Sequence, residues 1–362
     1  METNSTILNH AKISFVSAAT LFVLAVLFNA CSSDKTTEKI VDPENERYDV
    51  ALQDKLENLK AISAVDASVR PENNAKAKLG QFLYFDTRLS KDGKNSCNSC
   101  HNLNTFGVDN LPFSPGDKGL LGGRNSPTTL NAALHASQFW DGRAKDVEEQ
   151  AGGPILNPIE MNIPSEQFLI DRLKTIDLYK KLFATAYPTE QDPFTYKNVQ
   201  DAIGAFERAL ITPSRYDEYL NGKKDALTLD EKKGLMSFTQ VGCINCHNGE
   251  ALGGGAGFQK FGMFANYWDY TKSTKRDEGR FELTKNEADK YFFKVPSLRN
   301  IEKTHPYFHD GSVKSLDEAV KIMAKTQLNY KLNNEEVKNI TAFLKALNGD
   351  IPADYKTAPM GL

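Results

Sequence analysis

The sequence has few cysteines, little net charge and almost no strand pattern. Only five of its 362 residues are cysteine, and four of them form two close pairs, so none is left for an ordinary disulfide framework. The formal net charge of −3 at pH 7 is too close to neutral to indicate nucleic-acid binding. Alternation of apolar and polar residues, which marks a half-buried strand, is scarce. These absences argue against a disulfide scaffold, a nucleic-acid binder and a β-rich fold.

Long apolar runs are also lacking, with one exception near the N-terminus, at residues 13–28. This run is shorter than the roughly 20 residues that a membrane-spanning helix needs. Because a lysine precedes it and a small residue and Cys31 follow it, residues 1–30 are predicted to be a signal peptide. The segment resembles a bacterial lipoprotein signal, which implies that Cys31 carries a lipid anchor. Residues 31–50, which are polar and charged, are then expected to form a flexible tether.

Helical patterns dominate the rest of the chain. Capping-box spacing occurs three times ahead of apolar residues at helical intervals: Thr228 with Glu231, Ser315 with Glu318, and Asn333 with Glu336. Further helices are expected at residues 72–82, 166–183 and 196–210. Between them lie long connections rich in glycine and proline, at residues 111–127, 152–164 and 252–262. Such loops are usually functional when they are ordered.

A short motif occurs twice and reads Cys-x-x-Cys-His. Its members are Cys97, Cys100 and His101 in the first copy and Cys243, Cys246 and His247 in the second. This is a c-type haem attachment sequence. On one helical turn the two thiols face the same side, where each can add to a haem vinyl group, and the adjacent imidazole becomes the proximal iron ligand. The two copies therefore predict two covalent haems.

A single copy would leave other interpretations open. A redox dithiol of the thioredoxin type would sit near a βαβ pattern, and half of a zinc site would need further cysteine or histidine at short spacing. Neither accompanies the motif here. The residues alone leave several candidates for the remaining axial ligands: His135, His305, His309, Met161, Met236, Met263, Met323 and Met360. For any one of these methionines, packing in the core is the ordinary role.

A longer series of sequence blocks resembles the bacterial di-haem cytochrome c peroxidases. The blocks are residues 85–90, 97–109, 124–128, 138–143, 153–154 and 160–162, then 298–301, 306–309 and 319–323. The resemblance runs from about Lys78 to Leu347. It implies a mainly α fold with little strand and two cytochrome c-like domains, each with one covalent haem. Residues 51–213 would carry the peroxidatic haem and residues 214–355 the electron-transfer haem, with the boundary at the polar stretch 214–227.

The same resemblance implies an exported enzyme that reduces hydrogen peroxide to water. Two electrons would come, one at a time, from a small periplasmic cytochrome c or copper protein, and the second haem can hold an oxidising equivalent meanwhile. The protein would lie in the periplasm and meet the membrane through its N-terminal lipid only. A homodimer is compatible with the sequence.

The resemblance also assigns roles to individual residues. Met323 corresponds to the distal ligand of the electron-transfer haem, and His/Met ligation would raise its reduction potential. Glu160 corresponds to the acid–base carboxylate, with Gln150 and Pro154 beside it in the pocket. Trp140 corresponds to a tryptophan between the two haems. One calcium ion would be bound by Asn125 and by the backbone of Thr304 and Pro306.

One position departs from the family. A histidine that caps the resting peroxidatic iron corresponds here to Asp117, and no histidine lies between His101 and His135. Aspartate cannot supply a neutral imidazole, so the peroxidatic haem is predicted to be open at rest. Near Asn125, His309 is expected to be structural.

Two other functions compete with the peroxidase interpretation. The related methylamine-utilisation type of di-haem enzyme oxidises a protein substrate, but it has a tyrosine where this chain offers Met323. A plain di-haem electron carrier would need no pocket residues such as Gln150, Pro154 and Glu160.

Overall fold

The computed structural model describes residues 42–56, 59–253 and 257–362. The predicted signal peptide, Cys31 and most of the predicted tether lie outside these residues. As expected, the fold is mainly α-helical. Within the described ranges, the one sheet pairs β1 (Phe258–Lys260) with β2 (Phe292–Lys294) in antiparallel register. No helix in this part of the chain combines the length and the apolar character needed to cross a membrane.

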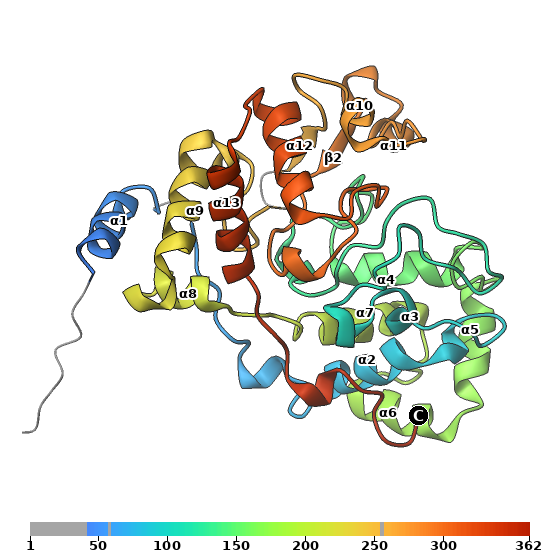
Figure 1. The fold of residues 1–362 in the computed structure, drawn as a ribbon. Helices are drawn as coiled ribbons and strands as arrows, with labels where there is room; N and C mark the ends of the chain where they lie inside the picture. Colours follow the sequence, from blue (N-terminus) through green and yellow to red (C-terminus); the bar gives the residue numbers. More distant parts are fainter. Residues whose placement is uncertain (1–41, 57–58, 254–256) are drawn as a thin grey trace, which may run out of the picture. The chain divides into compact units, whose positions relative to one another are not determined.

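The helices follow the chain from α1 near the start to α13 near the end (Figure 1). Their bounds are α1 Pro43–Gln53, α2 Ala75–Phe85, α3 Cys97–Cys100, α4 Val147–Leu156, α5 Glu166–Lys174, α6 Asp177–Ala186, α7 Tyr196–Glu207, α8 Arg215–Leu220, α9 Leu229–Val241, α10 Tyr267–Thr271, α11 Phe281–Thr284, α12 Leu316–Leu328 and α13 Asn334–Ala346.

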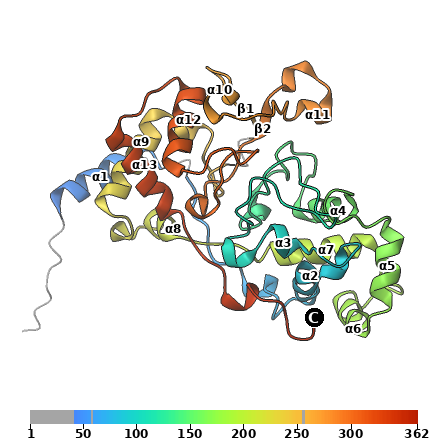
Figure 2. The ribbon, with the colours of Figure 1, turned by 45° about the vertical axis from the view of Figure 1, so that its right-hand side comes forward.

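Two helix pairs organise the described chain. Helix α2 packs on α7, and α9 packs on α13, as both views show (Figures 1 and 2). Each pair surrounds its own apolar core, the first completed by α4, α5 and α6 and the second by α1 and α8. Each Cys-x-x-Cys-His segment therefore has a helix pair beside it, as two related halves would require.

A glycine brings the backbones of each pair into close contact. A Cβ atom on Gly80 would lie 1.8 Å from the carbonyl oxygen of Ala202, and one on Gly234 would lie 1.8 Å from that of Asn339. Any side chain at these positions would push the helices apart, so the crossing requires glycine. The two halves thus repeat a packing device as well as a haem motif.

The folded part of the chain begins earlier than the sequence predicted. Residues 43–53 form α1, which packs on α9, whereas a flexible tether was expected up to residue 50. Leu52 is fully buried in the second core, and Asp49 accepts hydrogen bonds from the buried Lys232 and from Tyr219. Apolar burial and a buried ion pair therefore fix a segment whose polar composition suggested a tether.

The limits of the two halves also differ from the expected boundaries. Ile351 and Tyr355, beyond α13, pack with Tyr84 and Phe206 of the first half. The stretch 214–227, in contrast, contains α8, whose Tyr216 and Tyr219 lie in the second core, the half to which residues 214–355 were assigned. The start of the described chain thus packs on the second half, and its end packs on the first half.

The predicted helix starts agree with the structure. One predicted helix is interrupted, however, and one predicted loop is partly helical. Full capping boxes form at Thr228 and at Asn333. The expected helix 166–183 breaks between α5 and α6. The expected loop 152–164 begins inside α4, which includes Pro154. Its proline and glycines suggested a loop, yet Val147, Ala151 and Ile155 bury one helical face, and this packing outweighs the local propensity.

Candidate functional site

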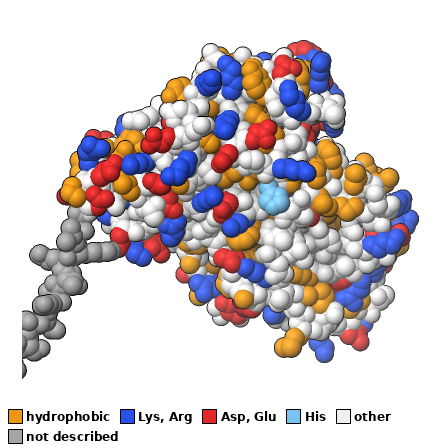
Figure 3. All heavy atoms as spheres, viewed as in Figure 1, with side chains coloured by type: hydrophobic (Ala, Val, Ile, Leu, Met, Phe, Trp, Pro, Cys, Tyr) orange, Lys and Arg blue, Asp and Glu red, His pale blue; other side chains and the backbone are white. Residues whose placement is uncertain are grey.

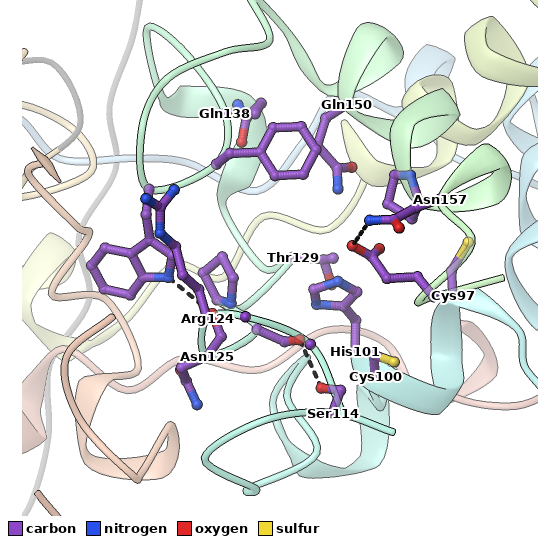
Figure 4. A pocket seen from close by; sticks show the side chains of 18 of the residues that line it. Cys97, Cys100, His101, Ser114, Arg124, Asn125, Thr129, Gln138, Gln150 and Asn157 are labelled. Carbon is purple, nitrogen blue, oxygen red and sulfur yellow. Dashed lines mark hydrogen bonds between the residues drawn. The ribbon is translucent and has the colours of Figure 1, made fainter. Parts of the chain in front are cut away.

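A cavity of about 480 Å³ opens beside α3 in the first half of the chain (Figure 4). Ligand sites generally occupy cavities of roughly 300–1,000 Å³. Several residues singled out from the sequence line this cavity, among them Cys97, Cys100, His101, Trp140, Gln150 and Glu160. Pro154 and Asn125 line it too. The structure therefore brings the first haem motif together with the predicted pocket residues, although these are far apart in the sequence.

The first motif forms the single helical turn α3. Ser96 and Ser99 close it with a capping box, and the backbone N–H of His101 donates to the carbonyl of Cys97. Burial raises the pKa of the Cys100 thiol to about 11, and it also raises the pKa of Cys97. Both sulfurs are therefore neutral at pH 7. Inert buried thiols fit covalent attachment to a haem better than they fit a reactive dithiol.

The imidazole of His101 is buried without a hydrogen-bond partner on Nδ1. Burial lowers its pKa, so the ring is neutral and can offer a lone pair to a metal. Its backbone carbonyl accepts a hydrogen bond of 2.6 Å from the hydroxyl of Tyr84, which fixes the residue at the end of α3. A neutral imidazole and two paired thiols at the cavity wall are the groups that a covalent haem requires, so the residues present fit this cofactor.

The second motif has a related geometry. Cys243–Asn245 form a 3-10 turn after α9, and Gly242 ends that helix in the left-handed conformation. Nδ1 of His247 lies 3.1 Å from the carbonyl oxygen of Leu252. If Nδ1 donates this bond, Nε2 keeps its lone pair, which is the usual arrangement of an iron-ligating histidine. Burial raises the pKa of Cys243 to about 11.

Met323 lies on α12, partly buried at the edge of the apolar cluster that contains Phe261, Tyr267 and Tyr307. No described contact joins it to His247, so its role as an iron ligand stays a prediction. No group of three or more His, Cys, Asp or Glu side chains in the described ranges is placed to hold a metal ion. The two motifs therefore gain no further ligands of the kind that a zinc site would need.

Glu160 lies in the tight turn that follows α4. Its Oε1 accepts a hydrogen bond of 2.7 Å from the Nδ2 of Asn157 (Figure 4), and its backbone N–H donates to the carbonyl of Asn157. Burial raises the pKa of this carboxyl, while the nearby charge of Arg143 and the bond from Asn157 lower it in part. Sequence reasoning missed Asn157 and Arg143 because only the folded turn brings them to Glu160.

A second carboxyl in the cavity wall was also missed. Glu207, the last residue of α7, is 3% exposed and lines the cavity. Burial, together with the charge of Glu148, raises its pKa to about 8. It is therefore protonated at pH 7 and adds no charge to the cavity. Its position at the end of an amphipathic helix gave no signal of this environment.

Trp140 links the cavity wall to the second half of the chain. Its indole N–H donates to the backbone carbonyl of Asn125 at 2.9 Å. Its own carbonyl accepts a bond of 2.7 Å from the backbone N–H of Lys294, in β2. The tryptophan thus lies at the junction of the two halves. A position between the two haems stays a prediction.

Arg124 holds this junction together and was not recognised as a key residue in the sequence. Its guanidinium donates to both carboxylate oxygens of Asp277, at 2.7 and 2.8 Å, and to Asp141 at 2.7 Å. Asp277 is 1% exposed. Charge-assisted bidentate pairs of this kind are strong and directional. The loop 111–127 is thereby fixed to both its own half and the other.

Asp117 does not line the cavity, although Gly116 does. The carboxylate of Asp117 accepts backbone N–H groups from Asp92 at 2.9 Å and Lys94 at 3.3 Å. Its own backbone N–H donates to the carbonyl of Glu160 at 2.7 Å. Burial alone would raise its pKa, but these N–H donors lower it overall. Asp117 therefore anchors the loop as a carboxylate.

The residues expected around a calcium ion come from two loops that touch. The backbone N–H of Asn125 donates to the carbonyl of His309 at 2.7 Å. Nδ2 of Asn110 donates to the carbonyl of His305 at 2.8 Å, next to Thr304 and Pro306. The ring of His309 stacks on Phe293 at 4.3 Å, which agrees with a structural role.

Comparisons with known proteins point to one group of related di-haem proteins. The family model of the di-haem cytochrome c peroxidases matches residues 74–225. A cytochrome c551 peroxidase of Nitrosomonas europaea is 44% identical over 85% of this chain and 87% of its own length. The methylamine utilization protein MauG of Methylorubrum extorquens is 31% identical over 83% of this chain and 87% of its own length.

The fold has solved relatives as well. The crystal structure of a MauG-like protein associated with microbial copper homeostasis is 27% identical, with a TM-score of 0.68 over 79% of this chain and 93% of that one. With the matched family model, the identity to the peroxidases and the two haem motifs in hand, the chain belongs to the di-haem cytochrome c peroxidase family and carries two covalent haems.

Proposed function

We propose that this protein is a cytochrome c peroxidase that reduces hydrogen peroxide to water. The observation that carries the proposal is the cavity in which the neutral His101 and a buried, polar carboxyl group at Glu160 are brought together. An electron carrier would also need a cavity for its haem, but it has no use for a carboxyl group suited to proton transfer inside that cavity. The 44% identity to a cytochrome c551 peroxidase over most of both chains supports the same activity.

The first haem, when bound, supplies the iron at which peroxide would be reduced and the redox equivalents for the reaction. The chain's own contribution is proton transfer. In its carboxylate form, Glu160 can accept a proton from one peroxide oxygen and deliver it to the other, which then leaves as water. Asn157 orients the carboxyl through its bond to Oε1, and Gln150 on α4 adds a polar amide to the same cavity.

Electrons are proposed to reach this site from the second haem by way of Trp140, whose backbone and indole are bonded to both halves. Their source would be a small periplasmic cytochrome c or copper protein. On the face shown in Figure 3, acidic and basic side chains are intermixed and not separated by sign. Recognition of a donor would therefore depend on local patches and not on overall charge.

The methylamine-utilisation type remains the second candidate, since one such protein is 31% identical. The feature that separates the two is the distal ligand of the second haem, for which this chain offers Met323. Export to the periplasm with a lipid on Cys31 remains part of the proposal and depends on the N-terminal sequence alone.

The first prediction concerns proton transfer. Glu160→Gln should keep both haems but slow peroxide turnover by about a hundredfold to ten-thousandfold, because general acid–base groups typically contribute that much. Since the carboxylate form is required and burial raises its pKa, wild-type activity should fall as the pH drops through that raised value. The variant should lose this acidic limb. Steady-state pH profiles measure both effects.

The matched control is Glu166→Gln, an exposed carboxylate at the start of α5. It should leave rate and pH profile unchanged. Near-normal turnover of Glu160→Gln would remove Glu160 from the mechanism.

The second prediction concerns the ligand of the electron-transfer haem. Met323→Leu should abolish the near-infrared sulfur-to-iron band and lower the reduction potential of that haem, because thioether ligation favours reduced iron. Met263→Leu changes a methionine that is 55% exposed and should alter neither. An unchanged band in Met323→Leu would assign the ligand to another residue.

The third prediction concerns the resting state. Since the carboxylate of Asp117 is hydrogen-bonded to the backbone of Asp92 and Lys94 and does not line the cavity, the oxidised protein should show one high-spin and one low-spin haem by electron paramagnetic resonance. It should also react with peroxide without prior reduction. Two low-spin signals, with no reaction until an electron is supplied, would contradict this prediction.

The fourth prediction concerns calcium at the junction of the halves. Oxygen from Asn125 and the carbonyls of Thr304 and Pro306 are ligands that suit this ion. Nδ2 of Asn125 donates to the carbonyl of Leu111, while no described residue donates to Oδ1. A chelator should therefore lower the thermal midpoint of the wild type, added calcium should restore it, and Asn125→Ala should show neither effect. A midpoint insensitive to chelation would exclude the ion.

A further inference from the structure

A buried lysine and a histidine meet where the two halves of the chain join. Lys294, the last residue of β2, is 5% exposed. Its Nζ lies 2.8 Å from Nδ1 of His135, which follows the 3-10 turn Ala132–Leu134 of the first half. Neither residue takes part in the proposed reaction.

This pair differs from the other buried cations of the described chain. Arg299 pairs with Asp217 and Lys232 pairs with Asp49, and Arg124 pairs with two aspartates. No ion pair joins Lys294 to a carboxylate of the described residues, and burial lowers its pKa to about 8. A buried cation without a counter-charge is costly, so an anion is expected to share the site.

Hydrogen-bond donors of the pair also lack an acceptor. An ammonium group can only donate, so Nδ1 of His135 must accept from Lys294. Burial, and then the charge of Lys294, lower the pKa of His135, so the ring is neutral and its proton lies on Nε2. That Nε2 is buried and has no hydrogen-bond partner. The lysine and the histidine therefore both present N–H groups that require an oxygen atom.

The pair lies between the two haem-binding segments. Ala132 and Gln138, on either side of His135 in the chain, line the cavity of the first haem, and the backbone N–H of Lys294 donates to the carbonyl of Trp140. On the other side, Ser297 donates through its hydroxyl to the carbonyl of Ala251, just after the second motif. The pair is therefore joined by short stretches of chain to the wall of the first cavity and to the segment after the second motif.

We propose that Lys294 and His135 bind the carboxylate of a haem propionate. Each haem carries two propionates, so these are the anions that the fold itself brings to this junction, and a carboxylate supplies both the missing charge and the missing acceptors. The proposal rests on the two haems of the family and not on the peroxidase reaction. Either haem could supply the group, and the experiment separates the two.

The test is a redox titration of the holoprotein at several pH values without peroxide, with each haem followed by its own spectrum. Lys294→Met removes the charge with little change in length. The potential of one haem should fall, because a buried negative charge without its partner disfavours the added electron. That potential should also become more dependent on pH, since the unpaired propionate now takes up a proton in the accessible range. The haem that responds is the one whose propionate is bound.

Two further variants complete the test. Lys294→Arg should retain the wild-type potential and pH profile, because it keeps the charge and the donors. Lys338→Met, on the exposed face of α13, removes the same charge elsewhere and should shift neither haem. If Lys294→Met binds both haems fully and its potentials and pH profiles match those of Lys338→Met, the pair is structural and the proposal is wrong.

A second measurement keeps the proposal testable if Lys294→Met does not fold. His135→Asn leaves the lysine in place but removes the Nε2 donor. The propionate-bending band of one haem should then shift in resonance Raman spectra of the folded protein. An unchanged band would overturn the assignment. Because neither readout uses peroxide, a negative result here would leave the proposed peroxidase activity unaffected.

Discussion

The ion pairs of the partly buried Arg124 guanidinium are the interaction on which the junction of the two halves depends. It draws Asp141 of the first half and Asp277 of the second to one point. The segments around Arg124 have almost no regular secondary structure. Side-chain hydrogen bonds therefore hold them in place where a helix or a sheet would use backbone hydrogen bonds. The bonds from Asn125 to His309 and from Trp140 to Asn125 lie directly beside it. With the junction fixed in this way, the cavity has a stable wall and the two haem motifs have a defined relation.

Neighbouring carboxyl groups in this region behave differently because of their surroundings. Glu160 has one amide donor, and burial raises its pKa. Asp117 has two backbone N–H donors, which lower its pKa despite burial. The backbone bond from Asp117 to the carbonyl of Glu160 ties them together. One backbone hydrogen bond thus joins a group suited to moving a proton and another that only anchors the loop.

Much of the site could be found from the sequence, since the haem motifs and pocket blocks have recognisable residues at fixed spacing. The cavity does bring Gln150, Trp140 and Glu160 to the first motif. Residues whose environment forms only on folding could not be recognised in this way. Glu207 looked like any residue on an amphipathic helix, yet α7 buries it completely enough to raise its pKa to about 8. Likewise, no pattern in the sequence indicated that Lys294 is buried.

By itself, the sequence determined the mainly helical class, the two attachment sites and the helix starts, because these depend on local spacing and on capping side chains. Tertiary structure decided the limits of the halves. Leu52 and Tyr355 bury their side chains in cores that lie far away in sequence, which no local pattern records. It also decided which charged groups pair and which stay without a partner. Those outcomes depend on burial and on distances between segments that only the fold brings together.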